Sequence, residues 1–262
     1  MIPEAYINEW SAVAHWHTVA MVEQDLVLSR AVVEIFAHPV LSKCLAFRGG
    51  TALHKLILPP ASRYSEDIDM VQVEAGPIGP IFDACREVLA PFLGEPKRNQ
   101  GPGVMTMIFR FQSETAPVQP LRLKVEINSR EHSGSSGIER KPFMVSSRWF
   151  SGECSIPTYS LEELLGSKLR ALYQRRKGRD LFDLWLGLTI GAARPELMAG
   201  HFQRYLAFSG LSVSAREYRL NMDSKIDHPA FVHDLDYLLR PDVRYDLREA
   251  YQLLDREVLS RL

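Results

Sequence analysis

The sequence has few cysteines and no long apolar run. Its three cysteines, Cys44, Cys85 and Cys154, are far apart and odd in number, which argues against a disulfide scaffold and does not match the spacing of a metal cluster. No apolar stretch approaches the roughly 18 residues that a membrane helix needs. The opening MIPEAYINEW lacks the basic and apolar regions of a signal peptide. We therefore expect a cytoplasmic protein with reduced thiols and no membrane partner.

An excess of charge of one sign is also missing. The 262 residues include 31 lysines and arginines against 32 aspartates and glutamates, which gives a formal net charge of −1. A globally basic surface is thereby excluded, so nucleic-acid binding would need a local patch. The hydrophobic content of 46% is ordinary for a globular protein, and a chain of this length can bury a sizeable core.

Apolar periodicity divides the chain into a mixed half and a helical half. Helices are predicted at 7–37, 51–58 and 81–92, and strands at 45–47, 68–73, 104–111 and 121–127. The run SGSSG at 133–137 predicts a loop. From about Ser160 onward, leucine-rich helical periodicity continues to the end. The pattern predicts an α+β fold, a small mixed sheet flanked by helices, with domains at 1–157 and 158–262.

The run RYSEDIDM carries two aspartates separated by one residue. Because successive side chains of a strand alternate between its faces, Asp67 and Asp69 project to one side while Ile68 and Met70 point to the core. Two like charges on one face repel each other unless a cation lies between them, and Mg²⁺ prefers such oxygen ligands. Strand-end aspartates are also common on ordinary surfaces, so this pair alone leaves both interpretations open.

A third carboxylate is offered by the predicted strand LRLKVEI at 121–127. Its apolar residues share one face, and Glu126 shares the opposite face with Arg122 and Lys124. If this strand neighbours the aspartate strand, Glu126 completes a trio of carboxylates that can hold two magnesium ions. The alternative is a salt bridge between Glu126 and its basic neighbours.

The segment FRGGTALHKL ends a predicted strand on Gly49, Gly50 and Thr51 and then begins a helix. Glycines let the backbone approach a ligand closely, and a helix N-terminus offers free N–H groups to phosphate. This is not a Walker A loop, because no GxxxxGK[ST] is present. The alternative is a simple turn with Thr51 as the helix N-cap. Arg63 and Ser65 are further candidates for phosphate contact, unless they belong to a solvated loop.

In the second half, the predicted helix LEELLGSKLRALYQ has a lysine within its leucine stripe. The ammonium of Lys168 is costly there unless it snorkels to water or meets an anion. We favour an anion, either a triphosphate or a carboxylate of the site. In the next helix Asp180 and Asp183 share a face. As alternatives, Asp180 could complement the helix start and Asp183 could pair with a nearby arginine.

One segment between these helices concentrates basic residues, and it is the best candidate for contact with RNA. Its members are Arg170, Arg175, Arg176, Lys177 and Arg179. The alternative is an ordinary solvated face.

Together these motifs resemble the AbiEii/AbiGii-type nucleotidyltransferases, toxins of type IV toxin–antitoxin and phage-defence systems that include the mycobacterial MenT enzymes. The similarity lies in VEQDLVLSRAVVEIF, FRGGTALHKL, RYSEDIDM and LEELLGSKLRALYQRRKGRDLFDLW, which together cover most of residues 20–190. It implies a polymerase-β-like nucleotidyltransferase fold with a helical C-terminal domain that completes the active-site cleft. It also implies that Gly50 and Thr51 lie at the nucleotide phosphates and that Asp67 and Asp69 bind magnesium.

For the second half, the resemblance implies that Lys168 contacts the triphosphate and that Asp180 is essential, with Arg179 and Asp183 completing the same motif. Members of the family transfer nucleotides to RNA, in some cases to the 3′ end of tRNA, which blocks translation. The expected function is therefore Mg²⁺-dependent transfer of NMP from an NTP to RNA, with a cognate antitoxin as protein partner. Two alternatives stay open: a small-molecule or protein hydroxyl as acceptor, and a non-catalytic nucleotide-binding module.

Overall fold

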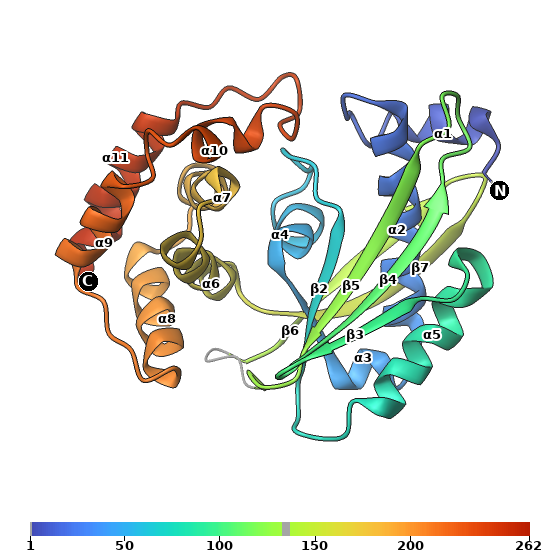
Figure 1. Ribbon diagram of the computed structural model, residues 1–262, viewed down its shortest axis with the longest axis horizontal. Coiled ribbons are helices and arrows are strands. Elements are labelled where there is room, and N and C mark those ends of the chain that lie inside the picture. The colour runs from blue at the N-terminus through green and yellow to red at the C-terminus, as the bar shows by residue number, and fades with distance from the viewer. Residues whose placement is uncertain (1, 133–136) are drawn as a thin grey trace. The chain divides into compact units, whose positions relative to one another are not determined.

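The structure is a computed structural model that describes residues 2–132 and 137–262 (Figure 1). The predicted loop at 133–137 therefore lies outside the described residues, apart from Gly137. The described residues divide between Tyr159 and Ser160 into two compact units. The first unit holds the sheet, and the second holds the C-terminal helices.

Seven strands of the first unit form one mixed sheet in the order β3-β4-β5-β2-β1-β7-β6 (Figure 1). They are β1 (Leu45–Arg48), β2 (Asp67–Gln72), β3 (Lys97–Gly101), β4 (Val104–Gln112), β5 (Pro120–Asn128), β6 (Glu139–Ser146) and β7 (Ser151–Thr158). Strand β2 runs antiparallel to β1 and parallel to β5, while β1 runs parallel to β7. The two strands predicted to carry carboxylates, β2 and β5, are thus direct neighbours.

The apolar face of this sheet packs in one core with two long helices, α2 (Val19–Ala37) and α5 (Gly79–Leu93). Alternate strand residues such as Ile68, Phe109 and Val125 are completely buried there. The period-two pattern read from the sequence places the intervening polar residues of β2 and β5 on the opposite face. That opposite face carries the candidate site.

The single helix predicted at 7–37 is wrong. Two helices, α1 (Glu4–Trp10) and α2, are separated by residues 11–18, and α3 (Leu41–Cys44) follows. The hydroxyl of Thr18 accepts a hydrogen bond from the backbone N–H of Met21 at 3.2 Å, which caps the start of α2. The break also lets Trp10 and Trp16 turn their indole N–H groups towards Asp25 of α2.

The helix predicted at 51–58 begins earlier and changes form along its length. It starts at Gly49 as α4 (Gly49–Ala52) and continues as a π-helical turn, η1 (Leu53–Ile57). Thr51 therefore lies inside the first turn rather than at the N-cap, and the interpretation of Thr51 as a simple cap is wrong. A π-turn inside a helix is uncommon and is frequently found beside functional sites.

Strands β3, β6 and β7 were not predicted. The sequence of β3 is polar and all its residues are exposed, while Pro142 in β6 and Pro157 in β7 argue against strands. These strands form through contacts with other strands. Strand β3 forms an antiparallel ladder with β4, and β6 forms one with β7. Pairing with a neighbouring strand overrides weak local propensity in all three strands.

The second unit is built from helices that pack around a leucine-rich core. They are α6 (Leu161–Gln174), α7 (Gly178–Thr189), α8 (Pro195–Phe208), α9 (Ala215–Asp223), α10 (Pro229–Val232), η2 (His233–Leu235), α11 (Leu247–Glu257) and η3 (Leu259–Arg261). Helix α6 packs against α7 and α8, and its leucines Leu165, Leu169 and Leu172 are fully buried. Within the described part of the chain, no helix combines the length and apolarity needed to cross a membrane.

Candidate active site

The carboxylates of the first unit lie on one face of the sheet because of the register between β2 and β5. Asp67 is paired with Lys124, and Asp69 is paired with Glu126. The intervening Ile68 is completely buried on the other face, while the side chains of Asp67 and Glu126 are 32% and 37% exposed. The structure therefore brings Asp67, Asp69 and Glu126 together on adjacent strands, as the sequence predicted.

Lys124 lies between two of these carboxylates. Its Nζ is 3.3 Å from Asp67 Oδ2 and 3.3 Å from Glu126 Oε2. Partial burial by itself would lower the pKa of Lys124, but the charges of Asp67, Glu126 and Asp69 outweigh burial and raise that pKa above its usual value. The salt bridge considered as an alternative for Glu126 thus forms, and the same ammonium also pairs with Asp67.

The chemistry of this cluster fits a hard cation, although its side chains are not gathered around a single point. Among residues 2–132 and 137–262, no group of three or more His, Cys, Asp or Glu side chains is placed to hold a metal ion. Three carboxylates are nevertheless the donors that Mg²⁺ prefers. The Lys124 ammonium, in contact with two of them, shows where a cation is stabilised. The donor atoms are therefore of the kind that a divalent metal prefers, and the Lys124 ammonium contacts two of the three carboxylates.

The glycine pair allows two charged side chains to lie against the backbone of α4. Gly49 has a φ of +80°, and a Cβ at this residue would be 2.4 Å from Asp69 Oδ2. A Cβ at Gly50 would be 2.3 Å from the guanidinium nitrogen Nη2 of Arg63. Backbone conformation and close approach together require glycine at Gly49, whereas a Cβ at Gly50 would displace the end of the Arg63 side chain. The segment that looked like a phosphate cradle packs directly against a candidate metal ligand.

Arg63 and Ser65 belong to the same site rather than to a solvated loop. Arg63 is only 2% exposed, and its Nη1 donates to the carbonyl of Tyr64 at 3.0 Å. The hydroxyls of Thr51 and Ser65 are 2.8 Å apart. The guanidinium of Arg63 is thus held beside the first turn of α4.

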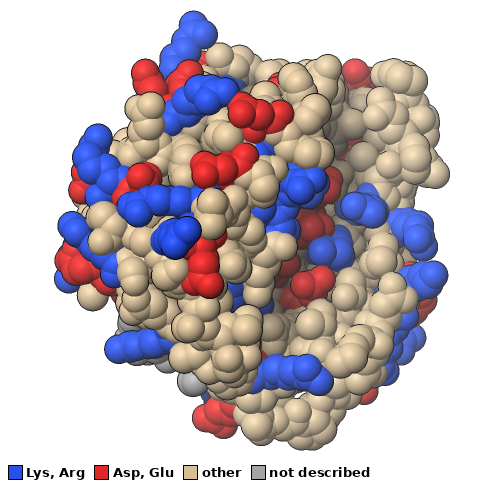
Figure 2. Space-filling view, turned by 60° about the vertical axis from the view of Figure 1, so that its left-hand side comes forward, with Lys and Arg blue, Asp and Glu red and all other residues tan. Residues whose placement is uncertain are grey.

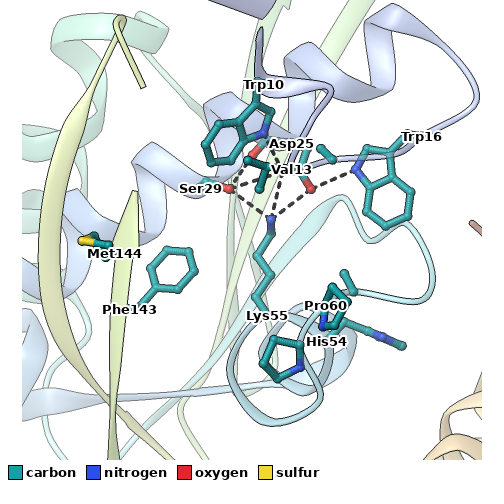
Figure 3. Close-up of a pocket in the computed structure, with 13 residues that line it drawn as sticks. Trp10, Val13, Trp16, Asp25, Ser29, His54, Lys55, Pro60, Phe143 and Met144 are labelled. Carbon is teal, nitrogen blue, oxygen red and sulfur yellow. Dashed lines mark hydrogen bonds and ion pairs between the residues drawn. The ribbon is translucent and has the colours of Figure 1, made fainter. Parts of the chain in front are cut away.

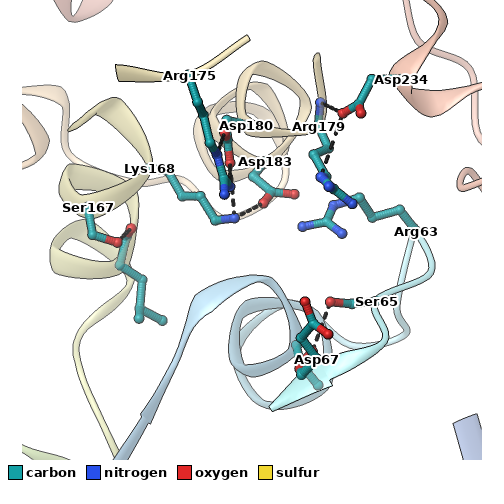
Figure 4. Close-up of polar contacts among 12 residues, drawn as sticks. Arg63, Ser65, Asp67, Ser167, Lys168, Arg175, Arg179, Asp180, Asp183 and Asp234 are labelled. Carbon is teal, nitrogen blue, oxygen red and sulfur yellow. Dashed lines mark hydrogen bonds and ion pairs between the residues drawn. The ribbon is translucent and has the colours of Figure 1, made fainter. Parts of the chain in front are cut away.

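In the second unit, Lys168 is buried and bound by two aspartates of α7 (Figure 4). Its Nζ is 3.2 Å from Asp180 Oδ1 and 2.9 Å from Asp183 Oδ2, and both aspartate side chains are completely buried. Arg175 completes the cluster with a bidentate contact to Asp180 at 2.7 and 2.8 Å. Lys168 therefore does not snorkel to water, and its immediate partners are carboxylates.

The electrostatics of this cluster keep Asp180 ionised. Burial alone would raise the pKa of Asp180, but Lys168 and Arg175 lower it below its ordinary value. With Asp183 also buried, two carboxylates face one ammonium and one guanidinium. Asp180 does lie in the first turn of α7, where it complements the helix start, and together with Asp183 it also joins one buried network across α6 and α7.

Most of the basic segment is engaged within the unit. Arg179 and Lys177 lie 3.6 and 3.4 Å from Asp234, which also accepts the backbone N–H of Arg179 at the start of α7. Arg170 lies over the ring of Tyr205, and Arg176 is exposed. On the face drawn in Figure 2, basic side chains are interspersed with acidic ones. The segment thus offers an exposed basic edge rather than a broad basic surface.

A buried ion pair that sequence reasoning missed anchors the π-helical turn η1. Asp25 of α2 accepts hydrogen bonds from Trp10 at 3.0 Å and Trp16 at 3.1 Å, and the Nζ of Lys55 lies 3.0 and 2.9 Å from its two oxygens (Figure 3). The cluster forms part of the wall of a cavity of about 410 Å³. The signal available in the sequence was Asp25 itself, a charge at a position that the helical pattern buries.

Two solved structures share the fold of this chain. JHP933 from Helicobacter pylori is 18% identical over 92% of this chain and 90% of its own, with a TM-score of 0.57. MenT4, a nucleotidyltransferase toxin from Mycobacterium tuberculosis, is 16% identical over 100% of this chain and 88% of its own, with a TM-score of 0.58. At such low identity the likeness shows the fold, which is the predicted α+β nucleotidyltransferase fold.

The sequence pattern of the family described as "Nucleotidyl transferase AbiEii toxin, Type IV TA system" matches residues 30–255. The chain therefore belongs to this family of nucleotidyltransferase toxins, and the family predicted from the sequence motifs is confirmed. No curated relative matches the sequence.

Proposed function

We propose that the protein is a Mg²⁺-dependent toxin that transfers NMP from an NTP to RNA, with the 3′ end of tRNA as acceptor, and thereby inhibits translation and growth. The observation that carries the proposal is the register of β2 and β5, which sets Asp67, Asp69 and Glu126 on one face. Membership of a nucleotidyltransferase toxin family supports both the chemistry and a cognate antitoxin as partner.

Residues of the first unit would bind the triphosphate. Asp67, Asp69 and Glu126 would hold the metal, which supplies charge neutralisation at the phosphates and a lowered pKa for the acceptor hydroxyl. The guanidinium of Arg63, packed on Gly50, would bind and orient the phosphates. In the transfer, the acceptor oxygen bonds to the α-phosphorus, the bond to pyrophosphate breaks, and the hydroxyl proton is released.

Lys168 and Asp180 of the second unit would serve the same reaction. The two aspartates fix the orientation of the Lys168 ammonium, so that a triphosphate oxygen approaching it would meet a positioned charge. Asp183 and Arg179 would support that position. Catalysis would thus rest on positioning and on charge neutralisation.

RNA is favoured as acceptor by the exposed edge of the basic segment. Arg176 is exposed and the side chain of Lys177 is 44% exposed, so their charges can reach phosphates of a large substrate. With a net charge of −1, the chain would depend on this local contact, and we expect binding to weaken steeply with salt.

The test is incubation with each labelled NTP, Mg²⁺ and total RNA, beside Asp69→Asn, which keeps the shape of the side chain and removes its charge. Label in RNA that disappears with Asp69→Asn supports the proposal. Label found only in protein or in a small molecule would show a different acceptor. No label with either protein would contradict transfer altogether and leave a non-catalytic nucleotide-binding module.

A cellular experiment tests the toxin role separately. Induced expression of the wild-type chain should arrest growth and lower incorporation of labelled amino acids, whereas Asp69→Asn should do neither. Equal growth arrest by both proteins would show that toxicity does not depend on the carboxylate site.

A further inference from the structure

Lys124 is shared by carboxylates of two strands. Parallel pairing sets it directly opposite Asp67, one strand spacing away. Its Nζ lies 3.3 Å from Asp67 Oδ2 and 3.3 Å from Glu126 Oε2. A single ammonium thus balances two of the three carboxylates in the cluster.

This position is particular to Lys124 and does not follow from basic character alone. Arg122 lies on the same strand and the same face, two positions earlier. Its side chain is 63% exposed, and its Nη2 lies 4.0 Å from Glu66 Oε1. The two residues therefore form a natural pair for comparison: each contributes one positive charge near the site, but only Lys124 is in contact with Asp67 and Glu126.

We infer that Lys124 is an internal counter-ion of the candidate metal site, which a divalent cation must displace, so that Lys124 lowers the affinity of the site for its metal. The inference rests on the proposed function, because it takes Asp67 and Glu126 as metal ligands. Mg²⁺ needs carboxylate oxygens at about 2.1 Å and tolerates little departure from its preferred geometry. An ammonium between the same oxygens occupies that space and repels the incoming ion.

The ion pairs of Lys124 are strong enough to compete with a metal ion and weak enough for a metal ion to displace them. The side chains of Lys124, Asp67 and Glu126 are 29%, 32% and 37% exposed, so each ion pair is partly screened by water. Ion pairs of this kind contribute little each, and a long lysine stem can carry its charge into solvent. Displacement is therefore expected to reduce metal affinity by about fivefold to tenfold rather than to abolish it.

Binding of Mn²⁺, followed by the electron paramagnetic resonance signal of the free ion, tests the inference without relying on activity. Lys124→Met should bind Mn²⁺ about fivefold to tenfold more tightly than the wild-type protein. Lys124→Arg, which keeps the charge, should resemble the wild type, and Arg122→Met should change the affinity by less than about twofold. In the presence of EDTA, Lys124→Met should melt at a lower temperature than the wild type, because its carboxylates lose their counter-ion.

Asp67→Asn separates failure of the inference from failure of the proposed function. If Asp67→Asn loses Mn²⁺ while Lys124→Met binds no more tightly than the wild type, the carboxylates hold the metal and Lys124 is not its competitor. If Asp67→Asn binds as the wild type does, the metal lies elsewhere and both proposals are wrong. Lys124→Gln replaces Lys124→Met in the comparison should the methionine variant not fold.

Discussion

At the scale of single residues, each unit of the protein places a lysine between carboxylates, with different consequences. Lys124 has a side chain that is 29% exposed, and its ammonium can exchange with a cation from solution. Lys168 is 8% exposed and faces two completely buried aspartates, so it is fixed in place. Partial exposure lets water screen the ion pairs of Lys124, whereas burial makes the ion pairs of Lys168 part of the folded core of its unit.

Lys168→Met is expected to affect both stability and transfer. Removing the ammonium leaves Asp180 with Arg175 and takes the Lys168 ion pair away from the buried Asp183 carboxylate, at a cost of about 3 kcal/mol in the free energy of unfolding. Transfer measured where the variant is folded should fall by about a hundredfold or more. Urea denaturation and steady-state kinetics measure the two effects.

The double variant Lys168→Met with Asp183→Asn separates these effects. Neutralising Asp183 should recover part of the lost stability, because a neutral amide costs less to bury than a carboxylate that has lost the Lys168 ammonium. Transfer should stay low, since the ammonium is still missing. If activity returned together with stability, Lys168 would have only a structural role.

Gly49→Ala tests the close approach between α4 and Asp69. A φ of +80° is unfavourable for alanine, and the added Cβ would be 2.4 Å from the Asp69 carboxylate. We expect a loss of about 1–2 kcal/mol in unfolding free energy, together with a loss of transfer because Asp69 must move. Gly200→Ala in α8 is the matched control, since a Cβ there meets nothing within 4 Å. The control should be neutral or slightly stabilising, and equal effects in the two variants would contradict this explanation.

At the scale of the elements, the helix that carries the glycine pair is fixed at its far end. The π-turn η1 presents Lys55 to Asp25 of α2, and Trp10 and Trp16 from the segment around α1 bind the same carboxylate (Figure 3). The buried carboxylate of Asp25 thus connects α2 to the segment around α1 and to η1, which continues α4. The position of the glycine pair relative to β2 depends on this anchor.

Lys55→Met should therefore destabilise the first unit strongly. The side chain of Asp25 is 3% exposed, and without the ammonium its charge would be stabilised only by neutral donors. We expect a loss of about 3 kcal/mol or more in unfolding free energy, accompanied by a change in tryptophan fluorescence. Arg86→Met breaks the exposed ion pair with Glu95 and should leave the melting temperature unchanged. A similar melting temperature for both variants would show that the Asp25 network is not an anchor.

The last carbonyls of helix α6 accept hydrogen bonds from Lys225, a buried lysine of the second unit. This contact predicts that stability depends on pH. Lys225 donates to the carbonyls of Leu172 and Tyr173 at 2.5 and 2.7 Å. Burial, followed by the charge of Arg176, lowers the pKa of Lys225 to about 8. Between pH 8 and about 10 the unfolded chain therefore holds more protons at this lysine than the folded chain, and its contribution to stability rises with pH.

Comparison with Lys225→Met isolates that contribution. Burial raises the pKa of the Cys85 thiol to about 12, so the contribution of this thiol to stability falls as the pH rises over the same range. The prediction is thus the difference between the proteins: from pH 8 to about 10, wild-type unfolding free energy should increase relative to that of the variant. Parallel curves from urea denaturation would contradict the assignment.

At the scale of the whole molecule, local pattern identified the strands and helices that carry the site. Alternation in β2 and β5 placed Asp69 and Glu126 on polar faces, and the leucine stripe of α6 identified Lys168 as an ammonium that needs an anion. These features depend on side-chain period, which a sequence displays directly. The motifs around them led to the family, which the comparison confirmed. The catalytic roles of the individual residues stay predictions.

What the sequence could not show depends on contacts between distant segments. The pairing of Lys124 with Asp67 follows from strand register, and the Asp25–Lys55 pair joins α2 to η1. The edge strand β3 exists because β4 offers it a partner. The break at 11–18 is similarly fixed by indole contacts to Asp25. None of these has a local signature, because each is decided by a partner elsewhere in the chain.

The position of the label distinguishes nucleotidyl transfer to the 3′ end of RNA from other reactions. Purified tRNA is incubated with Mg²⁺, the wild-type protein and NTP labelled at either the α- or the γ-phosphate, with and without prior periodate oxidation of the RNA 3′ end. We predict incorporation of the α-label only, lost after periodate treatment and absent with Asp69→Asn. Incorporation of the γ-label, or undiminished labelling of oxidised RNA, would contradict the account.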